Sequence, residues 1–271
     1  MTDYTDLLPI AHQAVDLAQG IMRTMQPGAL TAKGDRDMAS EVDLAIEEQV
    51  RALLANLTPD IGFLGEENGT SGVTDGLMWA LDPVDGTVNF VHGSPLCAIS
   101  LGLIAENRSV LGVIDLPFLT SRYSAAEGAG AQANGEPISI SRTDRIGEAV
   151  VALGDYAVGV GSEAKNQIRF ALTERLGSDV QRIRMHGSAA IDLAWLAAGH
   201  VDAVVMLANK PWDTAAGVVI AREAGALVVD HDGSPHTFES RATLAASAGL
   251  MPAILALVGE ESLNGDFTIG E

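Results

Sequence analysis

The chain has 271 residues, with 36 acidic against 16 basic side chains and a formal net charge of −20 at pH 7. A surface of this charge repels nucleic acid and anionic membranes, so we expect neither as a partner. The single cysteine, Cys97, excludes an intramolecular disulfide, and the acidic N-terminus lacks the basic and then apolar order of a secretory signal. No stretch reaches the ~20 uninterrupted apolar residues of a membrane-spanning helix. We therefore expect a cytoplasmic protein.

The first half of the chain predicts two helices followed by strands. Apolar residues recur at helical spacing over 5–25 and again over 40–57. Strands bounded by turns that contain Gly or Asn are then expected at 61–64, 77–81, 98–104, 109–116 and 122–125.

The second half alternates between the two kinds of element. Helical patterns at 163–176, 188–198, 214–224 and 251–258 bracket short strands at 203–206, 226–229 and 242–246. Such alternation is typical of α/β structure. We expect an N-terminal α+β half, residues 1–145, and a C-terminal α/β half, residues 146–271, without a linker or an internal repeat.

The segment Asp82-Pro83-Val84-Asp85-Gly86-Thr87-Val88-Asn89-Phe90 places two carboxylates and a hydroxyl directly after the strand predicted at 77–81. We expect Pro83 and Gly86 to end this strand and bend the backbone. Hard cations such as Mg²⁺ prefer oxygen ligands, and carboxylates that leave one turn can share a pair of metal ions. The same residue types also make ordinary turns, so a simple connecting turn stays open as an alternative.

Two further acidic motifs favour the metal site. Gly65-Glu66-Glu67 follows the apolar segment 61–64, and Trp212-Asp213-Thr214-Ala215-Ala216-Gly217 opens a helical run. Asp213 is therefore expected at a helix N-terminus, where helix capping is its alternative role. Together, four carboxylates lie at the ends of predicted elements, where the sites of α/β proteins gather: Glu66, Asp82, Asp85 and Asp213.

With GEE at 65–67, DPVDGTVNF at 82–90 and WDTAAG at 212–217, the chain resembles the inositol monophosphatase family over essentially its whole length. Members of that family are Mg²⁺-dependent, lithium-sensitive phosphatases that carry these motifs in this order. The resemblance implies an α/β fold, a layered αβαβα sandwich of the inositol monophosphatase and fructose-1,6-bisphosphatase type, with the metal site between the halves. Val84 and Ser40 depart mildly from the family, which usually has Ile or Leu and Thr there.

The resemblance also implies a role for each motif residue. The metal ligands are the four carboxylates of Glu66, Asp82, Asp85 and Asp213 and the carbonyl of Val84. They hold two or three Mg²⁺ ions, with Mn²⁺ as a substitute and Li⁺ or Ca²⁺ as inhibitors.

The catalytic residues implied by the resemblance are Glu66, Thr87 and Asp43. The Thr87 hydroxyl, hydrogen-bonded to Asp43, works with Glu66 to orient and deprotonate the attacking water. A solvated charge in the first turn of a helix is the alternative role of Asp43. Lys33 lies in the region where the family often has a lysine near the metals.

The chemistry accounts for these residue types, because a phosphate monoester and an ionised water repel each other. One metal ion lowers the pKa of a water while a second stabilises the leaving alkoxide. Backbone N–H groups of Gly86 and Thr87, and of Gly187 and Ser188 before a helix, are expected to face phosphate or sugar oxygens. The full set of predicted substrate contacts is Asp85, Gly86, Thr87, Ala189, Met206, Lys210 and Asp213.

Met206 and Lys210 leave the substrate open. Many inositol-selective members carry an acid at the position of Met206 and commonly a His at that of Lys210. A methionine cannot accept two hydrogen bonds from a diol, while Lys210 attracts a second anionic group. Inositol 1-phosphate is the leading substrate. Fructose 1,6-bisphosphate, histidinol phosphate and 3′-phosphoadenosine 5′-phosphate are the alternatives. Family members usually dimerise, so we expect a homodimer that acts on a small-molecule phosphate monoester.

Two rival classes of protein share some of these features. A haloacid-dehalogenase-type phosphatase uses acids two positions apart, whereas Asp82 and Asp85 are three apart with Pro83 between them. This spacing disfavours a covalent aspartyl phosphate. A non-catalytic divalent-metal or anion-binding module is the second rival, and release of phosphate excludes it.

Overall fold

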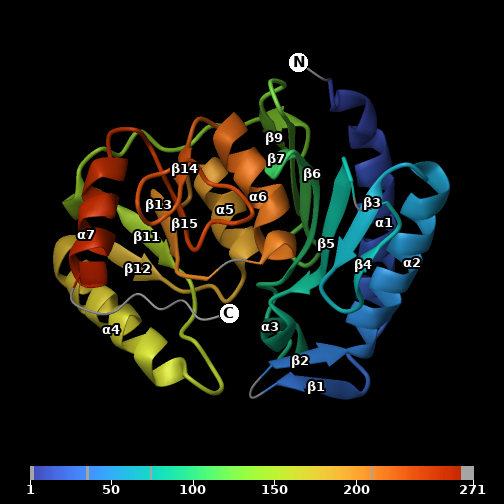
Figure 1. Ribbon diagram of the computed structural model, residues 1–271, viewed down its shortest axis with the longest axis horizontal. Helices are drawn as coiled ribbons and strands as arrows, with labels where there is room; N and C mark the ends of the chain where they lie inside the picture. Colours follow the sequence, from blue (N-terminus) through green and yellow to red (C-terminus); the bar gives the residue numbers. More distant parts are fainter. Residues whose placement is uncertain (1–2, 35–36, 74, 209, 264–271) are drawn as a thin grey trace.

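The computed structural model describes residues 3–34, 37–73, 75–208 and 210–263, and Figure 1 shows their arrangement in layers. The N-terminal part begins with η1 (Thr5–Leu7), α1 (Leu8–Thr24), the paired strands β1 (Leu30–Gly34) and β2 (Asp37–Ser40), and α2 (Glu41–Leu57). The helix predicted over 5–25 is thus a 3-10 turn followed by α1, which has Pro9 in its first turn, where no backbone donor is needed.

An eight-stranded sheet follows, with strand order β10-β9-β8-β7-β6-β5-β3-β4. Its strands are β3 (Gly62–Gly65), β4 (Gly69–Ser71), β5 (Met78–Asp85), β6 (Ala98–Ala105), β7 (Arg108–Leu116), β8 (Ser121–Ala126), β9 (Ala131–Ala133) and β10 (Glu136–Pro137). Between β5 and β6 lies the short helix α3 (Thr87–Val91). All pairs are antiparallel except β3 with β5, which run parallel.

A five-stranded sheet follows, with order β12-β11-β13-β15-β14. Its part of the chain contains η2 (Ile146–Glu148), β11 (Val150–Leu153), α4 (Ser162–Asp179), β12 (Arg182–Arg184), α5 (Ala189–Ala197), β13 (Ala203–Met206), α6 (Pro211–Glu223), β14 (Leu227–Val229), β15 (Thr243–Ala246) and α7 (Met251–Leu263). Strand β11 runs parallel to β12 and β13, while β15 is antiparallel to β13 and β14.

The elements stack in five layers, which confirms the predicted α/β sandwich. Helices α1 and α2 cover one face of the eight-stranded sheet, and α5 and α6 lie between its other face and the five-stranded sheet. The outer face of the second sheet carries α4 and α7 (Figure 1). Each sheet buries apolar side chains on both faces, as a middle layer must. None of the described helices is long and apolar enough to cross a membrane.

Helix α6 approaches the eight-stranded sheet closely because glycines face it. A Cβ added at Gly102 on β6 would lie 2.5 Å from Ala215, and one added at Gly112 on β7 would lie 2.5 Å from Ala216. A Cβ on Gly217 would likewise meet Leu193 of α5 at 2.5 Å. The small residues of the WDTAAG motif therefore allow α6 to pack closely on the sheet, and this packing brings the first turn of α6 to the end of β5.

One local expectation was wrong, and one alternative role is excluded. Strand β5 does not end before Pro83 but continues to Asp85, because the ladder to β6 is irregular between Asp82 and Asp85 and no backbone donor of Pro83 is required there. Asp213 is not an N-cap; Lys210 has that position, Pro211 begins α6, and Asp213 lies in its first turn. The division of the chain near residue 145 stays a prediction, although the two sheets draw on separate segments of sequence.

Candidate active site

Four acidic side chains from three elements meet where the two halves face each other. Glu66 directly follows β3, and the parallel register of β3 and β5 pairs Gly65 with Leu81. Glu66 therefore lies beside Asp82, within hydrogen-bonding reach of its carboxyl group. Asp85 ends the same strand, and Asp213 approaches from α6.

Burial and the neighbouring carboxylates raise the pKa values of Asp82, Asp85 and Asp213. Burial, then the charges of Glu66, Asp85 and Asp213, raises the pKa of Asp82 well above its usual range. Asp213 is half-buried, and its pKa is raised by burial and by Asp85 and Glu66, while Lys210 and Lys33 oppose the shift. Clustered acids of this kind are costly unless a cation or a proton neutralises them.

Hard oxygen ligands suit Mg²⁺ and not a soft transition metal, so the donor set fits the metal that the sequence predicts. Val84 stands between the two predicted Asp ligands in the sequence of β5, and its carbonyl oxygen accepts a hydrogen bond from Thr87 Oγ1 at 3.1 Å. The positive group that the structure places here is Lys33, whose Nζ donates to Glu66 Oε1 at 2.6 Å and to Glu67 Oε1 at 3.0 Å. Lys33 thus lies against the acidic cluster.

Thr87 and Asp43 come together as the sequence predicts, 3.3 Å apart between Oγ1 and Oδ1. Asp43 is buried, and its other carboxylate oxygen accepts hydrogen bonds from Ser40 N at 2.9 Å and Ser40 Oγ at 2.5 Å. This capping box at the start of α2 fixes the carboxylate. Burial raises the pKa of Asp43 despite the donors on Ser40. Asp43 is therefore not the solvated charge of the alternative interpretation.

Asp85 is anchored by the start of α5. Its Oδ2 accepts hydrogen bonds from Ser188 Oγ at 2.7 Å and from Ala190 N at 2.5 Å. Burial nevertheless raises the pKa of Asp85 to about 7, with contributions from Asp192 and Glu66. The side chain of Ser188 thus holds a predicted metal ligand, while the contact predicted for its backbone N–H stays a prediction.

Glu47 positions the GEE turn, the turn at Gly65-Glu66-Glu67, a role that the sequence motifs did not indicate. This buried carboxylate of α2 accepts hydrogen bonds from the backbone of Glu67 at 2.8 Å and of Asn68 at 2.9 Å, and it pairs with Arg51 at 2.6 Å. A carboxylate that binds the amide after Glu66 fixes the direction in which Glu66 points. The only signal in the sequence is the i,i+4 spacing of Glu47 and Arg51, which is common on any helix.

The predicted substrate residues divide between a pocket and its surroundings. A pocket of about 250 Å³ is lined by Asp85, Gly154, Asp155, Arg169, Gly187, Ser188, Ala189, Asp192, Met206, Leu207, Ala208 and Asp213. Lys210 lies close enough to lower the pKa of Asp213. A larger hollow of about 820 Å³ lies against α2 and β3, where none of the four carboxylates contributes to the lining.

Gly86 is at the turn into α3 with φ of +89°, the left-handed region. A Cβ on it would lie 3.0 Å from the carbonyl oxygen of Leu96 and 3.1 Å from that of Gly187. Only glycine fits this turn without strain. The turn directs Thr87 back toward Asp43, while the predicted contacts of Gly86 and Thr87 with substrate stay predictions.

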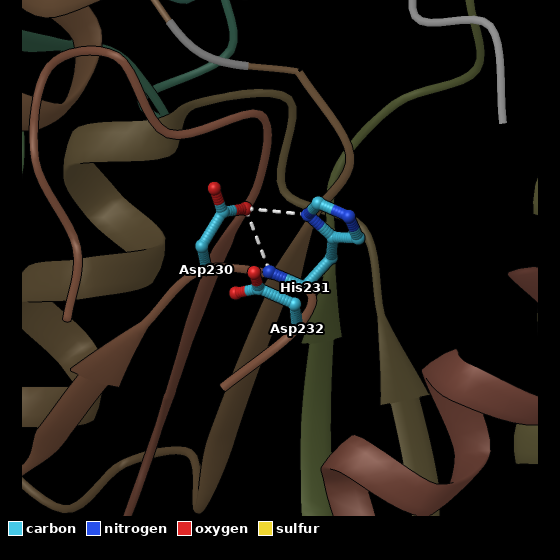
Figure 2. A group of neighbouring side chains, drawn as sticks. All are labelled: Asp230, His231 and Asp232. Carbon is cyan, nitrogen blue, oxygen red and sulfur yellow. Dashed lines mark hydrogen bonds and ion pairs between the residues drawn. The ribbon is translucent and has the colours of Figure 1, made fainter. Parts of the chain in front are cut away.

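A second acidic group lies outside the site. Figure 2 shows Asp230, His231 and Asp232, whose ligand atoms are within 4.8 Å of one another. Asp230 already accepts backbone hydrogen bonds from His231, Arg241 and Ala242. Asp232 accepts one from Ser234. The group therefore builds the turn after β14, and the metal site predicted from the motifs is elsewhere.

Comparison with known proteins decides the family. Residues 3–263 match the family model described as the inositol monophosphatase family. The chain belongs to this family. The inositol-1-monophosphatase ImpA of Mycolicibacterium smegmatis is 37% identical over 226 residues, which cover 83% of this chain and 82% of that protein. A Thermotoga maritima protein named fructose-1,6-bisphosphatase/inositol-1-monophosphatase is 37% identical over 200 residues, 74% of each chain.

Solved structures agree with the assignment. The extragenic suppressor protein suhB of Bartonella henselae matches with a TM-score of 0.87 and 28% identity, covering 94% of this chain and 98% of that one. An inositol monophosphatase of Anabaena matches with a TM-score of 0.85 and 28% identity, over 96% and 97% of the two chains. As an inositol monophosphatase family member, the chain is a phosphatase, a phosphoric monoester hydrolase, from a metal-dependent family.

Proposed function

We propose that this family member is a Mg²⁺-dependent phosphate monoester hydrolase, with inositol 1-phosphate as its leading substrate. The observation that carries the proposal is the meeting of Glu66, Asp82, Asp85 and Asp213, where burial and neighbouring negative charge raise the pKa values of the three aspartates. These carboxylates and the Val84 carbonyl would hold two or three Mg²⁺ ions. Bound Mg²⁺ supplies neutralisation of the phosphoryl oxygens and a lowered pKa for the attacking water.

The residues of the chain then orient and deprotonate that water. When Thr87 Oγ1 donates its hydrogen bond to Asp43 Oδ1 in place of the Val84 carbonyl, its lone pairs are free to accept a hydrogen bond from the water. The capping box holds Asp43 in place for this contact. Glu66 provides the second acceptor, so the water donates hydrogen bonds to two groups and its lone pair is directed at phosphorus.

Inositol 1-phosphate is the leading substrate because relatives across most of the chain carry that name. The pocket size of about 250 Å³ suits one ring of this kind beside the carboxylates. A specific observation favours a second candidate, a sugar bisphosphate: Met206 is buried in the pocket wall and offers no acceptor to a diol. The relative from Thermotoga maritima is named for both substrates.

The test is phosphate release by purified protein from inositol 1-phosphate and fructose 1,6-bisphosphate, with and without Mg²⁺. We expect turnover that requires Mg²⁺ and is inhibited by Li⁺ or Ca²⁺, and that falls by about 1000-fold or more in Asp85→Asn. Asp232→Asn, in the exposed turn of Figure 2, is the matched control and should retain full activity. An active Asp85→Asn variant, or Mg²⁺-independent turnover, contradicts the proposed site.

We further propose that the enzyme is a cytoplasmic homodimer without nucleic-acid or membrane partners. Support for the dimer comes from exposed apolar side chains in and beside α4 and β12, which a second subunit would cover: Val158, Val160, Phe170 and Met185. Light scattering on the purified protein measures the mass directly. A monomer at micromolar concentration contradicts the dimer while leaving the catalytic proposal intact.

A further inference from the structure

Arg169 is a buried cation in the wall of the catalytic pocket, and no motif of the sequence pointed to it. It projects from α4, is only 6% exposed, and lines the same pocket as Asp85 and Asp213. Figure 1 shows α4 in the C-terminal half and β5 in the other half. The pocket therefore combines Asp85 from the N-terminal half with Asp213 and the guanidinium of Arg169 from the C-terminal half.

No acid neutralises Arg169 in the described part of the chain. Its Nη1 donates to the carbonyl oxygen of Lys165 at 3.1 Å and its Nη2 to that of Leu207 at 3.0 Å. Burial lowers its pKa, and no neighbouring carboxylate raises it. Arg122 is also partly buried, but it pairs with Asp115 and Asp16.

Burial of a guanidinium without a counter-ion costs free energy, because only two hydrogen bonds to carbonyl oxygens offset its loss of hydration. Arginine carries five N–H donors in a planar fork, and two protein acceptors leave part of that fork unused. The fork matches an oxyanion group such as phosphate or carboxylate. An anionic ligand would therefore restore the balance of charge.

The other acids that line the pocket, Asp192 and Asp155, do not pair with Arg169. Asp192 contacts His186 Nδ1 at 2.5 Å. Asp155 is exposed, and one of its carboxylate oxygens lies 3.6 Å from where a Cβ on Gly187 would be. The lining of the pocket also includes Ala189, Met206 and Leu207.

We propose that Arg169 binds a second anionic group of the substrate, a phosphate or a carboxylate, while the scissile phosphate lies at Asp85 and Asp213. The inference rests on the proposed function and selects its second candidate over inositol 1-phosphate: a phosphate monoester whose alcohol is itself an anion. Lys210 adds positive charge near Asp213, where it opposes the rise in the pKa of that carboxyl group. Arg169 is thus a specificity-determining residue and not part of the hydrolytic machinery.

A purely structural role makes a different prediction. Through Leu207, Arg169 also ties α4 to the end of β13, and so to the loop that leads into α6. Loss of that tie alone would displace Asp213 and reduce activity toward every substrate by the same factor. Loss of an anion subsite reduces activity only toward substrates that carry the second anion.

The test compares two substrate pairs that differ in one anionic group. The first pair is fructose 1,6-bisphosphate and fructose 1-phosphate, and the second is 3-phosphoglycerate and glycerol 3-phosphate. Phosphate release with Mg²⁺ is measured for the wild type, Arg169→Met and Arg169→Lys. Arg175→Met is the matched control, because it removes one charge from the exposed side of the same helix.

The wild type should prefer the more anionic member of at least one pair by about 10- to 100-fold in kcat/KM. The pair that shows the preference identifies the second group as phosphate or carboxylate. Arg169→Met should remove that preference and leave the other member unchanged, Arg169→Lys should keep part of it, and Arg175→Met should keep all of it.

Two results overturn the inference alone: no preference in either pair by an active wild type, or an equal loss on both members in Arg169→Met and Arg169→Lys. Absence of turnover on all four compounds and on inositol 1-phosphate instead removes the proposed function, and the inference with it. Circular dichroism and thermal midpoints establish that each variant is folded. Absence of the wild-type preference overturns the inference even where a variant does not fold.

Discussion

Gly112 on β7 decides how closely α6 lies on the eight-stranded sheet, so Gly112→Ala displaces a whole side of the active site. The added Cβ would lie 2.5 Å from the Cα and 2.5 Å from the carbonyl oxygen of Ala216. Both are backbone atoms, which cannot rotate away. The backbone of Gly112 is not in the left-handed region, so the substitution acts through contact and not through its own φ.

The size of the effect follows from this overlap. Ordinary contact begins at 3.4 Å, so α6 must move outward by about 1 Å. Overpacking of this kind costs about 2 kcal/mol, or a fall of about 6 °C in Tm for a chain of this length. Asp213, one turn earlier on α6, moves with the helix away from Asp82 and Asp85. A 1 Å misplacement of a reacting group costs about 100-fold in rate.

The assay has two readouts, the thermal midpoint of the metal-free protein and the Mg²⁺ dependence of phosphate release. Gly112→Ala should lower the first and raise the Mg²⁺ concentration needed for half-maximal activity. Gly20→Ala is the control, because a Cβ there meets no atom within 4 Å and α1 gains helix propensity. It should stabilise the protein by about 0.5–1 kcal/mol without changing the Mg²⁺ requirement.

Unchanged stability and unchanged Mg²⁺ dependence in Gly112→Ala would refute the reasoning. Destabilisation with normal Mg²⁺ dependence would refute half of it, since the helix would then absorb the strain without moving Asp213. A crystal structure of the variant would separate the two by the position of α6.

Three further predictions concern single side chains of the site. Thr87→Val should lower kcat by about 100-fold while Thr87→Ser retains most of it, since the hydroxyl alone is required; equal losses would contradict the role of the hydroxyl. Glu47→Ala leaves buried donors unpaired, so it should lower the free energy of unfolding by about 3 kcal/mol and weaken Mg²⁺ activation. Substitution of the exposed Glu48 by Ala should do neither. Normal Mg²⁺ activation in Glu47→Ala would show that the GEE turn keeps its conformation without Glu47. Asp85 has a pKa of about 7 in the folded protein, against 3.8 for an ordinary aspartate side chain. Its ionisation therefore destabilises the metal-free protein as the pH rises between these two values. Denaturation midpoints of metal-free wild type should therefore fall relative to Asp85→Asn between pH 4 and about 7, and Mg²⁺ should restore the wild type; a flat difference would contradict the shift.

The motifs predicted the acidic cluster, since each places a carboxylate at the end of an element. The fold class followed from the family resemblance and the alternation of helices and strands, and the structure confirms it. The course of β5 could not be predicted, because Pro83 normally ends a strand in an antiparallel ladder. Only the pairing with β6 shows that the ladder is irregular at that point and needs no donor from Pro83.

The sequence by itself determined the reaction class, because Glu66, Asp82, Asp85 and Asp213 are chemically specific residues in ordered motifs. Tertiary structure alone decided what surrounds them. Glu47 and Arg169 lie in helical sequence with no signature, and each has its role only through groups distant in the chain, the amide of Glu67 and the carbonyl of Leu207. Local sequence specifies which chemical group a residue carries. The burial of Glu47 and Arg169, and the lack of an acidic partner for Arg169 among the described residues, arise only when the layers pack against one another.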